Sequence, residues 1–273
     1  MADRTVKLES ALRVRPGERL RLADVSADDT HGHDKGDANR IVAGDLERLD
    51  DLQERIWAER RHAVLIVLQG IDTSGKDGTI RHVMQAFNPR GCRVTAFGVP
   101  TPVEAAHDHL WRIHAAAPGL GEIAIFNRSH YESVLVVRVH ELVPEAQWSK
   151  RYDQINDFER ELAAEGATIL KFFLHIDRDE QRRRLQDRLD DPTKRWKFEL
   201  GDIAERKRWD DYLAAYEDAL ARCSTDAAPW YLVPANHKWF RNLAVGSILV
   251  DRLDALKPRY PEVTDLPKRI DLG

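Results

Sequence analysis

The chain has 273 residues, of which 42% are hydrophobic and 32% charged, a composition typical of globular proteins and unlike that of disordered ones. No apolar run approaches the roughly 18 residues of a membrane span, and the first ten residues lack the apolar segment of a signal peptide. We therefore expect a cytoplasmic protein without a membrane partner. The net charge of −4 gives no general attraction for nucleic acid, so any polyanion site has to be a local basic cluster.

The N-terminal part of the chain divides into a polar segment and a helix. Residues 1–40 are rich in Asp, Gly and His, and we expect an extended leader that drapes over the domain. Residues 41–57 carry leucine and isoleucine at helical spacing, which predicts an amphipathic helix. The two cysteines, Cys92 and Cys223, lie far apart without a CxxC pair, which excludes a metal site built on cysteine.

Five short apolar runs, separated by helical stretches, predict β-strands. They lie at residues 63–69, 93–99, 123–126, 168–176 and 230–234. Strand–helix alternation over this length predicts an α/β three-layer fold, with a five-stranded parallel sheet flanked by helices. We expect this domain to cover residues 41–260 and to be followed by a short tail, residues 261–273.

The first strand runs directly into a phosphate-binding motif. Residues 70–76, GIDTSGK, match GxxxxGK between an apolar strand and a helical stretch at residues 77–87, the context that the motif requires. Glycines let the backbone curve around an oxyanion, the helix N-terminus faces the same anion, and the lysine adds a mobile positive charge. The residues expected to bind phosphate here are Gly70, Thr73, Ser74, Gly75, Lys76, Asp77 and Gly78.

Two carboxylates depart from the usual form of this loop. Asp77 replaces the Ser or Thr that normally holds Mg²⁺, and Asp72 lies inside the loop itself. Because a carboxylate repels phosphate unless a cation lies between them, we expect Asp72 to ligate Mg²⁺ or to orient the attacking group. Asp77 is also explained as an acid near a helix N-terminus.

A second polar motif follows the third predicted strand. Asn127 occupies the place where P-loop enzymes usually carry an Asp for Mg²⁺, and Glu132, one turn further on, restores the negative charge. Asp72, Asn127 and Glu132 are therefore the expected metal ligands. Arg128 is placed to meet a phosphate. The Ser-x-x-Glu sequence that begins at Ser129 is also a helix capping box, and the two interpretations are compatible.

The fourth strand precedes a basic segment at residues 178–197 with eight basic and five acidic residues. We expect a helical lid at about residues 178–200 that screens phosphoryl charge and excludes water. A solvated helix with internal salt bridges is the alternative. The cations expected to contact phosphate are Arg184, Arg188, Lys194, Lys197 and, beyond the segment, Arg208. Apolar residues at helical spacing over 209–220 predict a core face, and the histidines at 107–114 predict packing rather than zinc.

Together these motifs resemble the family-2 polyphosphate kinases. The resemblance rests on GIDTSGKDGT, HDHLWRIH, FNRSHYE, RLDDPTKRWKF and APWYLVPANHKWFRN, which span residues 61–256. It implies a P-loop kinase-like fold with a lid, homo-oligomers, and Mg²⁺-dependent, reversible transfer of the terminal phosphoryl group of inorganic polyphosphate to a nucleoside mono- or diphosphate. Asp72, Lys76 and Arg128 are the implied catalytic residues. The NRSHYE form resembles the subgroup that accepts AMP and ADP; guanine acceptors stay open.

Two other functions compete with this one. An ATP-dependent kinase of a small metabolite or of a nucleoside monophosphate shares the loop and the lid, but a small acceptor does not need so many phosphate contacts. A non-catalytic nucleotide-binding module is disfavoured by the intact Lys76 and the surrounding acids and arginines. The basic cluster lacks interleaved aromatic residues, so a nucleic-acid enzyme is not expected.

Overall fold

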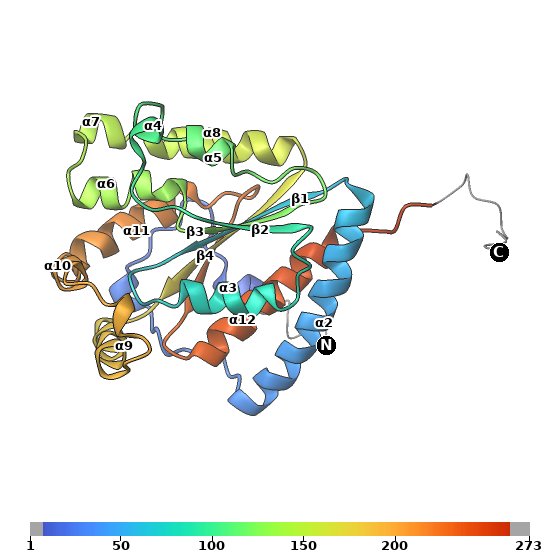
Figure 1. Cartoon of the computed structure of the whole chain (residues 1–273), viewed down its shortest axis with the longest axis horizontal. Helices are drawn as coiled ribbons and strands as arrows, with labels where there is room; N and C mark the ends of the chain where they lie inside the picture. Colours follow the sequence, from blue (N-terminus) through green and yellow to red (C-terminus); the bar gives the residue numbers. More distant parts are fainter. Residues whose placement is uncertain (1–7, 263–273) are drawn as a thin grey trace.

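Five parallel strands form the central layer of the structure, a computed structural model that describes residues 8–262 (Figure 1). The strand order is β2-β3-β1-β4-β5, which confirms the five-stranded parallel sheet. The strands are β1 (Ala63–Gln69), β2 (Cys92–Ala96), β3 (Ile123–Asn127), β4 (Ala167–His175) and β5 (Trp230–Pro234). All seven residues of β1 are buried, because helices cover both faces of this central strand.

Helices form a layer on each side of the sheet (Figure 1). One face is covered by α2 (Lys35–Glu59), α3 (Lys76–Met84) and α12 (Lys238–Ala255). The other face is covered by α5 (Trp111–His114), α6 (Val136–Val139), α7 (Glu145–Trp148), α8 (Arg151–Ala164) and α11 (Trp209–Cys223). The short helix α4 (Pro102–Ala105), which has no buried residue, lies on the same side. Alternate residues of β1 face the two cores, Val64 and Ile66 on one side and Leu65 and Val67 on the other. Among the helices of residues 8–262, none is long and apolar enough to cross a membrane.

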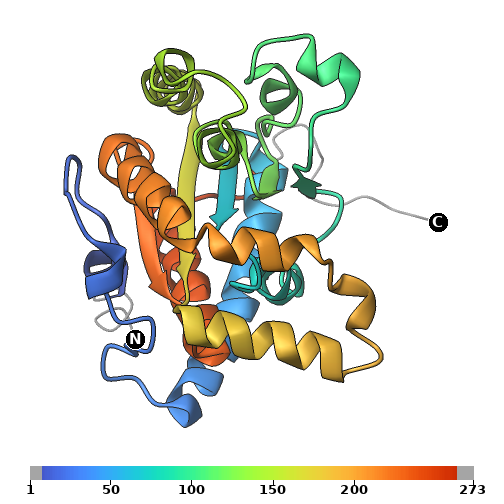
Figure 2. The same cartoon turned by 90° about the vertical axis from the view of Figure 1, so that its left-hand side faces the viewer.

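The lid region lies at the carboxyl edge of the sheet. It consists of α9 (Arg178–Asp190), the 3-10 turn η3 (Arg195–Lys197) and α10 (Gly201–Lys207). Figure 2 shows α9 and α10 projecting from this edge as two arms joined by a turn. Asp177 caps the start of α9 by accepting a hydrogen bond from the backbone N–H of Glu180, and the helix stops before Pro192. The helical structure thus continues to residue 207, beyond the expected limit near residue 200.

The N-terminal segment is less extended than predicted. Residues 8–12 are helical, and Leu8 and Leu12 are buried in the core beside α2 and α12. The backbone N–H of Val14 then donates to Trp230 O at 2.9 Å, so the segment also covers the β5 edge of the sheet. The helix expected to start at residue 41 begins earlier, at Lys35, where Asp34 caps α2. Of the expected tail, residues 263–273 lie outside the described residues.

A partly buried carboxylate lies between the N-terminal segment, α2 and α12. Asp251 of α12 has one oxygen that is buried without a hydrogen-bond partner among the described residues. Burial, together with the negative charges of Glu9, Asp45 and Asp254, raises the pKa of Asp251 from 3.8 to about 6. The folded state therefore favours the protonated form of this carboxyl group. Its contribution to stability is present below pH 3.8 and is lost as the pH rises through 6.

The substitution Asp251→Asn should consequently stabilise the protein at alkaline pH. At pH 8 it removes a charge that the fold disfavours, and the expected gain is about 1 kcal/mol after allowance for solvent screening of this partly exposed group. The gain should disappear near pH 4, where the folded wild-type protein carries a protonated Asp251. Thermal unfolding at both pH values measures the effect, with Asp211→Asn on the exposed face of α11 as a control. Equal changes in Tm at both pH values would contradict the prediction.

Candidate active site

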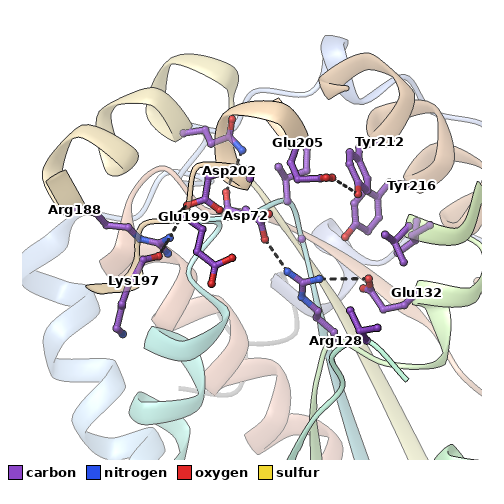
Figure 3. A pocket seen from close by; sticks show the side chains of 17 residues that line it. Asp72, Arg128, Glu132, Arg188, Lys197, Glu199, Asp202, Glu205, Tyr212 and Tyr216 are labelled. Atoms are coloured by element: carbon purple, nitrogen blue, oxygen red, sulfur yellow. Dashed lines mark hydrogen bonds and ion pairs between the residues drawn. The ribbon is translucent and has the colours of Figure 1, made fainter. Parts of the chain in front are cut away.

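A pocket of about 510 Å³ opens at the carboxyl edge of the sheet, under the lid (Figure 3). Because all five strands are parallel, the segments that follow β1 and β3 emerge at this edge together. The first supplies Asp72 from the phosphate-binding loop, and the second supplies Arg128 and Glu132. The lid contributes Arg188 and Lys197 from the opposite wall, so the pocket is bordered by charged groups on two sides.

The loop after β1 has the backbone geometry of an anion cradle. Gly75 has φ of 108° and Thr73 has φ of 68°, both in the left-handed region, so the chain curves tightly before α3 begins. Lys76 is buried, and its ammonium group donates to Gly70 O at 2.7 Å across the loop. Burial lowers the pKa of Lys76, although Asp72 acts in the opposite direction. The hydroxyl groups of Thr73 and Ser74 are buried and find no partner within the described residues, as suits a loop that hydrogen-bonds a phosphate.

Arg128 joins the two strand-end segments. Its guanidinium group lies 2.9 Å from Asp72 and 3.6 Å from Glu132, between the two carboxylates (Figure 3). Burial alone would lower the pKa of Arg128, but the two carboxylates raise it above its ordinary value. Arg128 has φ of 62°, a backbone conformation that costs energy for any residue other than glycine. Such conformations are often found at functional sites. We conclude that the strand end is shaped to aim this cation into the pocket.

The three expected metal ligands do not form one cluster. Asp72 and Glu132 both pair with Arg128, whereas Asn127 turns away and donates a hydrogen bond to Asp77 at 2.9 Å. Within residues 8–262 no group of three or more His, Cys, Asp or Glu side chains is placed to hold a metal. Mg²⁺ commonly takes only one or two carboxylates and completes its shell with water and substrate phosphates. Asp72 within the loop and Asp77 at its end therefore supply donors of the right chemistry.

The expected lid cations separate into three groups. Arg188 and Lys197 line the pocket, and Arg188 also lies 3.8 Å from Asp202. Lys194 pairs with Asp191 at 2.5 Å and Arg208 donates to the carbonyl of Val139, and neither lines the pocket. The expectation for these two residues is therefore not supported by their position.

Arg184 has a different position from the one expected. Its guanidinium group is buried behind the phosphate-binding loop and donates to the backbone carbonyls of Thr73, Ser74, Ala235 and Asn236, at 2.6–3.0 Å. It also forms an ion pair with Glu180. Through these hydrogen bonds Arg184, a residue of α9, connects the loop to the segment that follows β5. This position favours a role in supporting the loop, whereas the sequence led us to expect a contact with polyphosphate.

Several pocket residues were not identified from the sequence. Acidic side chains of the lid and two tyrosines of α11 line the cavity (Figure 3): Glu199, Asp202, Glu205, Tyr212 and Tyr216. Their arrangement includes a hydrogen bond of 2.6 Å from the Tyr212 hydroxyl to Glu205. Glu199, Asp202 and Glu205 follow the basic segment at intervals of three residues. This spacing indicates that they share one face of a helical stretch. The sequence analysis placed both tyrosines on the core face of α11, and Tyr216 is buried. Both residues nevertheless also line the pocket.

A buried polar network supports the segment that follows β3. The turn η2 (His130–Ser133) places His130 and Tyr131 in contact with Glu159 of α8, each at 3.0 Å. Lys171 of β4 lies 2.5 Å from the same carboxylate and donates to the Tyr131 hydroxyl at 2.8 Å. Burial alone would raise the pKa of Glu159, but Lys171 and His130 hold it below its ordinary value. The network fixes the segment that carries Arg128 and Glu132.

A phosphate-binding loop opposite a lid whose cations Arg188 and Lys197 line the pocket is the arrangement of a P-loop phosphotransferase, and this is the class that the fold and the site define. Comparison with known proteins narrows the class. The model of the polyphosphate kinase 2 family matches residues 33–261. The chain belongs to the polyphosphate kinase 2 family.

Relatives of known name and structure are similar over nearly the whole chain. The AMP/ADP-polyphosphate phosphotransferase of Meiothermus ruber is 53% identical over 260 residues, which cover 94% of this chain and 97% of that protein. The ADP-polyphosphate phosphotransferase of Rhodopseudomonas palustris is 45% identical over 83% of this chain and 82% of its own. The crystal structure of polyphosphate kinase 2 from Arthrobacter aurescens TC1 has a TM-score of 0.91 at 43% identity, and the match covers 94% of this chain and 92% of that one. The P-loop kinase-like fold is thereby confirmed.

Proposed function

We propose that the protein transfers the terminal phosphoryl group of inorganic polyphosphate to AMP and to ADP, reversibly and with Mg²⁺. The observation that carries the proposal is the pocket in which Arg128 and the lid cations Arg188 and Lys197 face each other across the Lys76 loop. Both substrates are polyanions, and cations on two sides of a cavity meet that requirement. The names of the Meiothermus ruber and Rhodopseudomonas palustris relatives support the donor and the acceptors.

The transfer needs positioning and charge neutralisation more than proton chemistry. A phosphate oxygen of the acceptor attacks the terminal phosphorus of polyphosphate, and the bond from that phosphorus to the bridging oxygen breaks. The products are a nucleotide one phosphate longer and a chain one unit shorter. Because the attacking oxygen is already anionic, no general base is required.

The residues of the pocket have separable tasks in this reaction. Lys76 and the loop N–H groups bind the donor end, and Arg128 screens the charge shared between donor and acceptor. Arg188 and Lys197 close over the phosphates from the lid and exclude water. Asp72 and Asp77 would hold Mg²⁺, which when bound neutralises the oxygens of the reacting phosphates.

The test is an assay of purified protein with Mg²⁺, long-chain polyphosphate and either AMP or ADP, with the nucleotide products quantified. ADP and ATP should form from AMP, and ATP from ADP. Formation of ATP from ADP alone would restrict the acceptors to the diphosphate. Activity only with ATP as donor would instead support a kinase of a small metabolite. The same assay with GMP and GDP tests guanine acceptors. Light scattering tests the homo-oligomer that the family resemblance implies.

Arg188→Ala should weaken the use of polyphosphate more than the binding of nucleotide. The side chain reaches the pocket from the lid, whereas Lys194, six residues away, is paired with Asp191 outside it. We expect the KM for polyphosphate to rise about tenfold in Arg188→Ala, since a hydrogen bond to a charged group contributes about 1.5–3 kcal/mol. Lys194→Ala, with the same change in charge, should stay within about twofold of wild type. Equal effects in the two variants would argue against the position of Arg188 in the lid.

A further inference from the structure

A buried amide in the lid helix α9 connects the lid to the phosphate-binding loop. Gln181 is only 1% exposed, although most residues of this helix are charged. Its Nε2 atom donates to Asp72 O at 3.3 Å, and its Oε1 atom accepts from Nη1 of Arg206 at 2.8 Å. Gln181 therefore bridges the loop after β1 and the second arm of the lid, α10.

The contact with Arg206 fixes the orientation of the Gln181 side chain. A side-chain amide has donor hydrogens on its nitrogen and an acceptor oxygen, whereas a guanidinium group can only donate. With Arg206 at the amide oxygen, the NH2 group of Gln181 has to face the carbonyl of Asp72. When Arg206 moves away, the amide oxygen loses this donor and the group is free to turn. The position of Arg206 thus decides whether Gln181 holds the loop.

The helix α9 holds three consecutive carbonyl groups of the loop. Arg184 donates to the carbonyls of Thr73 and Ser74, both at 2.9 Å. Gln181, one turn earlier, adds the carbonyl of the preceding loop residue. In a trans peptide the C=O and N–H bonds point in opposite directions, so the N–H groups of Thr73 and Gly75 point away from these donors. Loops of this type bind phosphate through such N–H groups, and the contacts from α9 stabilise the orientation that the anion requires.

The helix α10 connects two walls of the pocket. On one side Glu205 accepts a hydrogen bond of 2.6 Å from the Tyr212 hydroxyl of α11 (Figure 3). On the other side the next residue, Arg206, donates to Gln181 and, at 2.7 Å, to Arg178 O. Tyr212 and Gln181 both line the pocket. Arg206 is therefore the residue through which α10 contacts α9 and, by way of Gln181, the loop.

Arg206 holds this position against electrostatic repulsion. Burial and the positive charges of Arg178 and Arg182 lower the pKa of Arg206 below its ordinary value. Its two acceptors, an amide oxygen and a backbone carbonyl, carry no full negative charge. Hydrogen bonds between an arginine and a carboxylate are stronger than those to neutral acceptors, so this contact is released more easily than a buried ion pair. It suits a part of the lid that opens and closes.

We propose that Gln181 and Arg206 are positioning residues that couple closure of the lid to the shape of the phosphate-binding loop. With α10 in place, Arg206 fixes the amide of Gln181, and Gln181 holds the peptide group after Asp72 with its N–H toward the donor phosphate. With α10 displaced, the amide turns and the loop loses this support. The inference rests on the proposed function and deepens it, because a loop that is complete only under a closed lid disfavours transfer of the phosphoryl group to water.

The initial rate of ATP formation from ADP and polyphosphate in four variants tests the coupling. In Gln181→Met and in Arg206→Met, which nearly keep the side-chain length and remove its hydrogen bonds, kcat should fall about tenfold. The KM values should stay within about threefold, because the side chains that contact the substrates are unchanged. The double variant should be no slower than Gln181→Met, since Arg206 acts through Gln181. Arg206→Lys, which keeps a donor, should recover most of the rate.

Gln186→Met and Arg182→Met make the same changes on the exposed side of α9 and are the controls, with thermal unfolding of every preparation. Both should keep kcat within about twofold of wild type. A double variant of Gln181 and Arg206 that is about a hundredfold slower would show that the two residues act independently, and would overturn the coupling. A folded Arg206→Met protein with normal kcat would overturn it too, whether or not Gln181→Met folds. A wild-type protein that forms no ATP from polyphosphate would overturn the proposed function and the coupling with it.

Discussion

Replacement of Lys76 by methionine should lower the rate of phosphoryl transfer by about 10³-fold while the protein stays folded. The ammonium group is the positive charge at the base of the loop, and removal of one preorganised charge-stabilising group typically costs a factor of 10²–10³ or more. Methionine has a similar length and no charge, and burial already disfavours the charged form of Lys76. The fold should therefore tolerate the change, with a Tm equal to or above that of wild type.

The measurement is the initial rate of ATP formation from ADP and polyphosphate, beside thermal unfolding of the same preparation. Lys207→Met, at an exposed position at the end of α10, is a control for the loss of a lysine near the lid. A folded Lys76→Met protein with near-normal turnover would refute the assignment of the loop.

Glu159→Leu should destabilise the protein by about 3–5 kcal/mol, the largest stability effect that we expect from a single substitution. It leaves the ammonium group of Lys171 buried without its carboxylate, and removal of one partner of a buried ion pair costs about this much. His130 and Tyr131 lose the same acceptor. Chemical denaturation of wild-type and variant proteins measures the difference in the free energy of unfolding.

The double variant Glu159→Leu/Lys171→Met is the matched control. It removes both charges, so most of the lost stability should return if the unpaired ammonium group is the cause. The Tyr131 hydroxyl and the carbonyl of Cys223, which accept from Lys171, would still lose a donor, so recovery should be incomplete. A double variant no more stable than Glu159→Leu alone would show that packing, and not charge, dominates at this position.

The fold could be predicted to a large extent because its signals are local. β1, the glycine-containing loop and the helix α3 are consecutive in the sequence. The residues of each segment favour the backbone conformation that the segment adopts. The parallel sheet could be predicted from the alternation of strands and helices alone. The start of α2 was misplaced because the cap at Asp34 lies in a segment whose polar composition resembles a loop.

The site could be predicted only in part. Asp72, Lys76 and Arg128 belong to motifs that directly follow a strand, so their place in the fold could be predicted from neighbouring residues. The structure brings these three residues together at one edge of the sheet. The residues of the lid were harder to assign, since a run of arginines and lysines does not show which of them point inward. Arg188 and Lys197 reach the pocket, whereas Arg184 supports the loop.

The sequence by itself determined the α/β fold and the phosphate-binding loop, because each depends on neighbouring residues and on the backbone that they require. Only the tertiary structure decided the partners of each charged side chain. Asn127 meets Asp77, Arg128 lies between Asp72 and Glu132, and Arg241 packs on Gly75. Fifty or more residues separate most of these partners along the chain, as with Asn127 and Asp77, and their contact depends on packing that no local pattern encodes.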